Sequence, residues 1–279
     1  MSQVEDRTAN VRRWDNDRFV CSLFAPAGQR ADLMVLYAIN LEVSFIRERT
    51  TEPMVGRIRL QWWREAIEDV FDGGQARHPL LLSLGELVRR CELDRSHFRD
   101  ILAARERDFD DEPPPTLNEL IAYAEGTSAS LAKLSLKVLG ADTEANRAVA
   151  RDVGIVWALT GLVRSVPFQL RAQRLYLPQS VMEAAGFDRS RVARPGDNDA
   201  LRRAVTPVVE CAETFVRDAR ARRHAVTPEA LPILLWMTLA GGYLKRIRKS
   251  NFNPFAARVQ HRAPSQLVTL ALNHARRRY

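Results

Sequence analysis

Apolar residues recur at intervals of three and four through most of this chain, and this spacing constrains its fold more than any other feature. Two such runs cover residues 33–41 and 117–124. Side chains three or four residues apart lie on one face of an α-helix. No run alternates apolar and polar residues between turn signals, as a half-buried strand would. The sequence therefore predicts an all-α protein built from long helices.

Turn-forming residues divide the chain into roughly ten helices. Thr116, with Glu119 three residues later, predicts a capping box at a helix start, and Thr143 predicts another start. The clearest breaks are expected at residues 50–53, 72–79, 110–115 and 194–199. Because no polar linker separates two halves, we expect an N-terminal tail over residues 1–16 and one helical domain over residues 17–279.

The cysteines and the N-terminal residues bear on where the protein works. The three cysteines stand far apart and offer no zinc spacing or disulfide framework, so a reducing compartment is expected. The first twenty residues mix acids and arginines and lack the apolar stretch of a signal peptide. The longest apolar candidate for a membrane span, residues 230–244, is short and interrupted by proline and glycines. We expect a cytoplasmic protein.

The net charge of +8 gathers late in the chain. A basic region of this kind suits a diphosphate, an anionic membrane surface or nucleic acid, and it is equally often a solvated face. Peripheral contact with the inner face of a membrane is therefore one hypothesis for the C-terminal region.

Several stretches resemble motifs of the squalene/phytoene synthase family. They are Asp17-Arg18-Phe19, Leu23 to Pro26, Leu36 to Asn40, Arg59-Leu60-Gln61-Trp62-Trp63-Arg64, Ala158 to Arg164 and Arg174 to Pro178. Their order and spacing also fit the family from about residue 17 to the C-terminus. The resemblance implies a single-domain prenyl-synthase (terpenoid synthase-like) fold, with helices around a central cavity.

The same resemblance implies two aspartate-rich motifs on facing helices, which hold magnesium ions against a prenyl diphosphate. Carboxylates at i and i+4 share a helix face and are the hard ligands that Mg²⁺ takes. Here the first motif falls on Ser44, Phe45 and Glu48, and the second on Ser165 and Gln169. Only one of these five residues is acidic, so we predict no catalytic residues, no metal and no cofactor.

Other positions are candidates for binding a ligand without metal. Arg164, Arg171 and Arg174 carry guanidinium groups that bind phosphate in a bidentate fork, although a buried arginine paired with a glutamate is an equal alternative for Arg164. By resemblance, further candidates are Tyr37, Gln61, Arg64 and Tyr176. Simple packing in a helical core remains an alternative for each of them.

Two local patterns need a separate interpretation. The acids from Asp108 to Glu112 precede three prolines, and we expect them to be solvated at a helix end rather than to bind metal. Trp62 and Trp63 are adjacent on a helix and about 100° apart around its axis. One of these two rings should therefore face a surface or a partner.

A narrower resemblance is to the non-catalytic branch of the family that includes mitochondrial complex I assembly factor 6. It rests on Glu52-Pro53-Met54, Tyr123-Ala124-Glu125, Gly154-Ile155-Val156, Arg164 with Pro167, and Phe252 with Phe255. It implies a pseudoenzyme that helps to assemble respiratory complex I, with complex I subunits or an assembly intermediate as partners. We also expect a monomer and no nucleic-acid partner.

Two alternatives stay open. One is a prenyltransferase that condenses two prenyl diphosphates head to head in squalene, phytoene or hopanoid biosynthesis, with Mg²⁺ and with Glu42, Glu48 or Glu52 as ligands. The other is a protein that binds a prenyl or phospholipid chain in an apolar cavity without reacting it.

Overall fold

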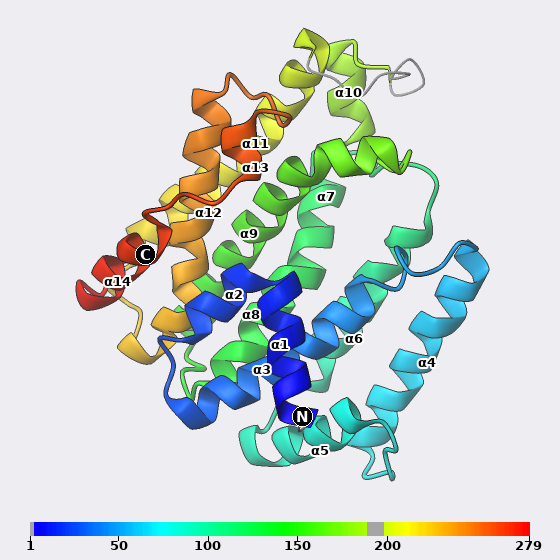
Figure 1. The fold of residues 1–279 in the computed structure, drawn as a ribbon, viewed down its shortest axis with the longest axis vertical. Coiled ribbons are helices and arrows are strands. Elements are labelled where there is room, and N and C mark those ends of the chain that lie inside the picture. Colours follow the sequence, from blue (N-terminus) through cyan, green and yellow to red (C-terminus); the bar gives the residue numbers. More distant parts are fainter. Residues whose placement is uncertain (1–2, 189–197) are drawn as a thin grey trace.

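A computed structural model describes residues 3–188 and 198–279, and these residues form helices and connecting segments with no strand (Figure 1). The predicted all-α class is confirmed, and most of the predicted break at 194–199 lies outside the described residues. The first half contains α1 (Gln3–Trp14), α2 (Asn16–Ser22), α3 (Ala27–Ser44), α4 (Pro53–Phe71), α5 (Pro79–Cys91), α6 (Arg95–Arg105), η1 (Glu106–Phe109), α7 (Leu117–Ala124), η2 (Glu125–Ala129) and α8 (Ser130–Val138). The second half contains α9 (Glu144–Arg171), α10 (Gln179–Ala185), α11 (Asp199–Ala221), η4 (Pro228–Ala230), α12 (Leu231–Lys249), α13 (Ala257–Gln260) and α14 (Gln266–Ala275).

The helix starts at Thr116 and Thr143 are where the sequence predicts them. The Thr116 hydroxyl accepts a hydrogen bond from the amide of Glu119 (3.3 Å), and the Thr143 hydroxyl accepts one from the amide of Asn146 (3.2 Å). Each bond satisfies one of the amides that a helix leaves without a partner at its N-terminus. The caps fix where α7 and α9 begin.

Helix α9 is the centre of the fold. It contacts α7, α8, α11 and α12 along its 28 residues. By length and composition α9 could cross a membrane, which the sequence analysis did not foresee, but 61% of its most apolar window is buried inside the protein. Its apolar residues form the middle of the core. The helix continues through Pro167 to Arg171.

Helix α9 crosses the π-helical turn η2 at very short range, and Gly154 makes this crossing possible. A Cβ atom at Gly154 would lie 2.3 Å from the Cα and 2.5 Å from the nitrogen of Ala129. These are backbone atoms, so no side-chain rotation could relieve the clash. Only glycine fits at this position.

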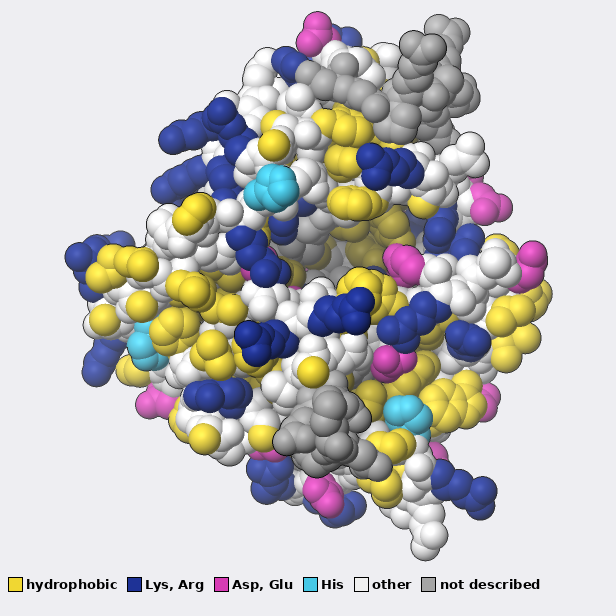
Figure 2. All heavy atoms as spheres, viewed as in Figure 1, with side chains coloured by type: hydrophobic (Ala, Val, Ile, Leu, Met, Phe, Trp, Pro, Cys, Tyr) yellow, Lys and Arg dark blue, Asp and Glu magenta, His cyan; other side chains and the backbone are white. Residues whose placement is uncertain are grey.

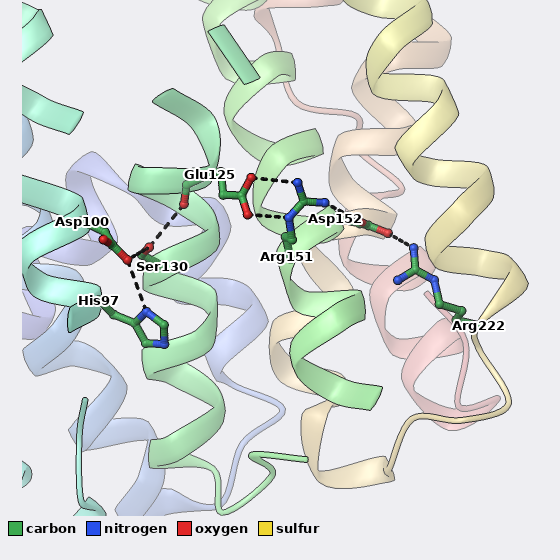
Figure 3. A network of polar contacts seen from close by, with 7 residues as sticks. All are labelled: His97, Asp100, Glu125, Ser130, Arg151, Asp152 and Arg222. Atoms are coloured by element: carbon green, nitrogen blue, oxygen red, sulfur yellow. Dashed lines mark hydrogen bonds and ion pairs between the residues drawn. The ribbon is translucent and has the colours of Figure 1, made fainter. Parts of the chain in front are cut away.

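Polar side chains bridge the helices around the crossing (Figure 3). Glu125 accepts two hydrogen bonds from Arg151 (2.5 and 2.8 Å), and the buried Asp152 carboxylate lies between Arg151 (3.6 Å) and Arg222. The chain of charges joins η2 to α9 and to the end of α11. Because each charge has an opposite neighbour, the network tolerates the burial of Asp152.

Asp17 on α2 contacts residues from the C-terminal part of the chain. Its carboxylate accepts hydrogen bonds from the Tyr243 hydroxyl (2.7 Å) and from the Gln266 amide (3.1 Å), and it pairs with Arg262 (3.0 Å). Helix α1 lies against α3, and its Val11 is fully buried. The N-terminal helices and the C-terminal segment therefore pack on one body.

Candidate functional site

The second half of α9 faces a hollow, which we call the central hollow. Gly154, Gly161 and Phe168 are seven residues apart and so lie nearly in line on α9. The line is packed against η2 at Gly154, but no atom lies within 4 Å of a Cβ built at Gly161, and Phe168 is 61% exposed. Figure 2 shows this face of the molecule hollowed near its centre, with apolar side chains inside.

The first metal-motif positions lie at the end of α3. The Ser44 hydroxyl donates to the Leu41 carbonyl (3.2 Å), and Phe45 packs edge-on against Trp14 (5.6 Å between ring centroids). Glu48 keeps access to solvent, but the surrounding protein removes part of its hydration and raises the pKa of its carboxyl group, and the Asp108 carboxylate adds to the rise. The Ser44 hydroxyl and the Phe45 ring therefore occupy positions where the family motif has metal-binding carboxylates.

The second metal-motif positions, Ser165 and Gln169, bond to their own helix and to the segment that follows it. The Gln169 amide donates to the Ser165 hydroxyl (2.5 Å) and to the Leu162 carbonyl (2.9 Å). Its oxygen accepts from the backbone amide of Tyr176 (3.0 Å). Ser165 in turn donates to the Leu162 carbonyl (3.0 Å). The hydrogen bonds of Ser165 and Gln169 therefore stabilise the end of α9.

These residues do not fit the magnesium ions that the resemblance implies. Mg²⁺ in a prenyl-synthase site is held by carboxylates, and Glu48 is the only one among the five positions. The cationic groups of Arg105 and Arg174 lie near enough to Glu48 to favour its charged form. Within residues 3–188 and 198–279, no three His, Cys, Asp or Glu side chains gather in a way that could hold a metal ion.

Next to Glu48 is a buried polar cluster that the sequence analysis did not foresee. Asp108 is 7% exposed and accepts hydrogen bonds from the hydroxyls of Tyr123 (2.7 Å) and Tyr176 (2.6 Å) and from Arg105 (3.2 Å). The expectation that Asp108 is solvated is therefore wrong, because η1 turns it inward. Burial raises the pKa of Tyr176, so its hydroxyl remains a donor to Asp108.

Tyr37 lies in the core with no exposed surface. Its ring packs against Trp236 (6.0 Å), and Trp236 packs against Trp157 (5.9 Å). The guanidinium of Arg18 lies over both tryptophan rings, 4.5 Å and 5.2 Å from their centroids. Arg18 also pairs with Asp15 (2.7 Å). A cation–π cluster thus occupies the space beside Tyr37.

Arg164 pairs with no glutamate among the residues that the structure describes. Its guanidinium stacks 3.5 Å above the centroid of the Tyr243 ring and donates to the carbonyl of Val259 (3.2 Å). Burial lowers the pKa of Arg164, opposed by nearby Tyr243 and Asp17. The side chain therefore ties α9 to α12 and α13.

The remaining candidates are divided between a small cavity and the surface. Arg174 and Tyr176 line a cavity of about 20 Å³ beside Asp108, whereas Arg171 is exposed. Gln61 and Arg64 lie on α4 and bond to each other (2.6 Å). The structure thus brings Tyr176, Arg174, Glu48 and the second motif together at the end of α9. Gln61, Arg64 and Arg171 lie outside this group.

Helix α4 exposes an apolar stripe, which we call the α4 face: Met54, Val55, Ile58 and Trp62. Trp62 is 48% exposed, while its neighbour Trp63 is 6% exposed. The prediction that one of the two rings faces outward is confirmed. Trp62 stands between two surface grooves of about 560 and 220 Å³.

The chain matches the family model described as squalene/phytoene synthase over residues 11–268. It is 27% identical to the NADH dehydrogenase (ubiquinone) complex I assembly factor 6 of Bos taurus, over 96% of this chain and 81% of that protein. It is 25% identical to the 15-cis-phytoene synthase of Synechocystis sp., over 89% of this chain and 77% of that one.

The fold is also similar to solved structures. A dehydrosqualene synthase superposes with a TM-score of 0.84 at 16% identity, over 98% of this chain and 95% of that chain. At this identity the likeness shows the fold and no more. The match to the family model over residues 11–268 shows that the chain belongs to the squalene/phytoene synthase family.

Proposed function

We propose that this protein acts without catalysis, as a factor in the assembly of respiratory complex I. The observation that carries the proposal is the state of the metal-motif positions. Ser44, Ser165 and Gln169 use their polar atoms on their own backbone and on Tyr176, and only Glu48 is acidic. Without carboxylates on both helices, a diphosphate cannot be ionised by the family's metal-dependent route.

Sequence similarity to assembly factor 6 proteins also supports this proposal. The assembly factor 6 of Bos taurus matches 96% of this chain at 27% identity, which is more of the chain and a higher identity than the 89% and 25% for the Synechocystis phytoene synthase. Assembly requires a surface for a protein partner. The α4 face offers one, because exposed tryptophan beside a groove is typical of the centre of a protein interface.

The charges around the α4 face favour a protein as its partner. Arg49 pairs with Glu42 (2.8 Å), Arg57 pairs with Asp110 (3.1 Å), and Arg64 pairs with Glu106. The rim of the face is therefore largely neutralised within the protein. Apolar centres with mixed, paired charges at the rim are usual in protein interfaces. We propose a complex I subunit or an assembly intermediate as the occupant.

The test is genetic complementation in the source organism. Deletion of the gene should reduce assembled complex I on a native gel and reduce NADH:quinone activity in membranes. Wild type should restore both, and the double variant Ile58→Ser/Trp62→Ser should not. Leu82→Ser, at another exposed apolar position (55% exposed) outside the α4 face, controls for surface polarity and should restore them. Unchanged complex I in the deletion strain would refute the proposal.

The prenyltransferase alternative predicts a different result. Purified protein incubated with farnesyl or geranylgeranyl diphosphate and Mg²⁺ would release pyrophosphate and form a head-to-head product. We expect no release above a protein-free control. Release that disappears in Glu48→Gln would establish catalysis and overturn the non-catalytic proposal.

The lipid-binding alternative rests on the central hollow, whose apolar lining could receive a prenyl or acyl chain. Native mass spectrometry of the purified protein distinguishes it. A co-purified lipid displaced by Gly161→Trp would favour a carrier, because Gly161 has open space beside it. We propose that the protein works as a cytoplasmic monomer with no resident cofactor and no nucleic-acid partner.

A further inference from the structure

Helix α14 presents its apolar side to solvent. At 100° per residue, Leu267, Val268, Ala271, Leu272 and Ala275 fall within a sector of about 140°. All five are exposed, with Leu267, Val268 and Leu272 at 60%, 61% and 47%. We call this sector the α14 face. A surface helix of a soluble protein ordinarily turns such a face to the core.

The polar side of α14 is what attaches it to the protein. Gln266 donates to Asp17 (3.1 Å), Asn273 donates to the Thr238 hydroxyl (3.0 Å), and the His274 ring packs 4.8 Å from Phe24. Leu270 alone inserts into the core, with no exposed surface. The orientation is therefore fixed by specific bonds, and rotating the helix would break them.

Basic residues predominate in the C-terminal part of the chain, where Arg248 pairs with Glu213 and Arg262 pairs with Asp17. No acidic residue follows Glu229, while nine basic residues do: Lys245, Arg246, Arg248, Lys249, Arg258, Arg262 and Arg276 to Arg278. The last three directly follow α14, are exposed, and form no ion pair with the described residues. In Figure 2, apolar side chains with basic ones at their edge cover the side of the molecule where Figure 1 places α14.

We propose that α14 docks this protein on an anionic lipid bilayer, with the α14 face inserted among the acyl chains and Arg276 to Arg278 at the headgroup phosphates. An exposed apolar face followed directly by three arginines without an ion pair among the described residues matches the boundary between hydrocarbon and anionic headgroups. The α4 face differs, because acidic and basic residues alternate around it and three of its arginines are paired. The proposal is independent of the role in complex I assembly.

The test is flotation of the full chain with vesicles. Wild type should float with vesicles of phosphatidylcholine containing about 30% phosphatidylglycerol and stay in solution with pure phosphatidylcholine. Changing Arg276, Arg277 and Arg278 together to Gln should weaken binding roughly a hundredfold at low salt, since each cation contributes about 1 kcal/mol near such a surface. Raising the salt should weaken wild type in the same direction.

A second variant separates insertion from simple charge attraction. Changing Leu267, Val268 and Leu272 to Ser leaves all cations in place and should still reduce binding by roughly tenfold or more. Ile58→Ser/Trp62→Ser on α4 is the matched control and should float like wild type. Circular dichroism checks that each variant is folded. Wild type that ignores anionic vesicles at low salt, or a folded serine variant that binds them like wild type, would overturn the proposal.

Discussion

The contact between α9 and η2 makes Gly154→Ala the most direct test of the packing. The new Cβ atom would lie 2.3 Å from Ala129 Cα, 2.5 Å from Ala129 N and 2.7 Å from the carbonyl carbon of Ser128. Carbon atoms in contact normally stay about 3.5 to 4.0 Å apart. Relief therefore needs α9 and η2 to separate by about 1 Å, at the centre of the fold.

The expected cost follows from two opposing terms. Overpacking a core costs roughly 1–3 kcal/mol, and the upper value applies because only backbone can move. Alanine in place of glycine within a helix returns about 1 kcal/mol. The net loss is about 2 kcal/mol in the free energy of unfolding. With an unfolding entropy of about 2.1 cal/mol/K per residue, the melting temperature of this chain should fall by roughly 3 °C.

Gly161→Ala is the matched control on the same helix, two turns further on. Nothing lies within 4 Å of its Cβ position, so only the helix-propensity gain of about 0.5–1 kcal/mol remains. This variant should melt about 1 °C higher than wild type. Differential scanning calorimetry of the three proteins measures both shifts. Equal melting temperatures for the two variants would refute the close crossing and the open hollow together.

Three further substitutions test the polar contacts. Asp108→Asn should destabilise by about 3 kcal/mol in chemical denaturation, because it leaves the mostly buried Arg105 side chain without its charge partner. A loss under about 0.5 kcal/mol would contradict this. Asp17→Asn should cost about 1–2 kcal/mol and speed tryptic cleavage after Arg262, whereas unchanged cleavage would show that Asp17 does not hold the C-terminal segment. Glu48→Gln tests the raised pKa of the Glu48 carboxyl group. Because the folded-state pKa lies above the unfolded value, Glu48 costs stability as the pH rises through the folded-state pKa. The Gln variant should therefore melt at a higher temperature than wild type at pH 8 and at the same temperature below about pH 4. A Gln variant that is less stable at pH 8 would reverse the sign of that argument.

Local features of this protein could be predicted from its sequence. The caps at Thr116 and Thr143, the helical class and the outward turn of one ring of the Trp62–Trp63 pair each depend on residues within about one turn of each other. Periodicity and capping are short-range effects, so the pattern of residues is sufficient for them. The sequence also shows the lack of acids at the metal-motif positions, because it gives the identity of each residue directly.

The tertiary structure decided what depends on distant partners. Asp108 is buried because Tyr176, 68 residues later, donates to it, and Arg164 takes the Tyr243 ring and the Val259 carbonyl instead of a glutamate. The sequence shows that α14 has an apolar side, but not which way that side points. Its contacts with Asp17 and Thr238, which lie far away in the chain, hold the polar side inward and leave the apolar side in solvent. Hydrogen-bond partners and burial arise when remote helices meet, and no local pattern encodes that meeting.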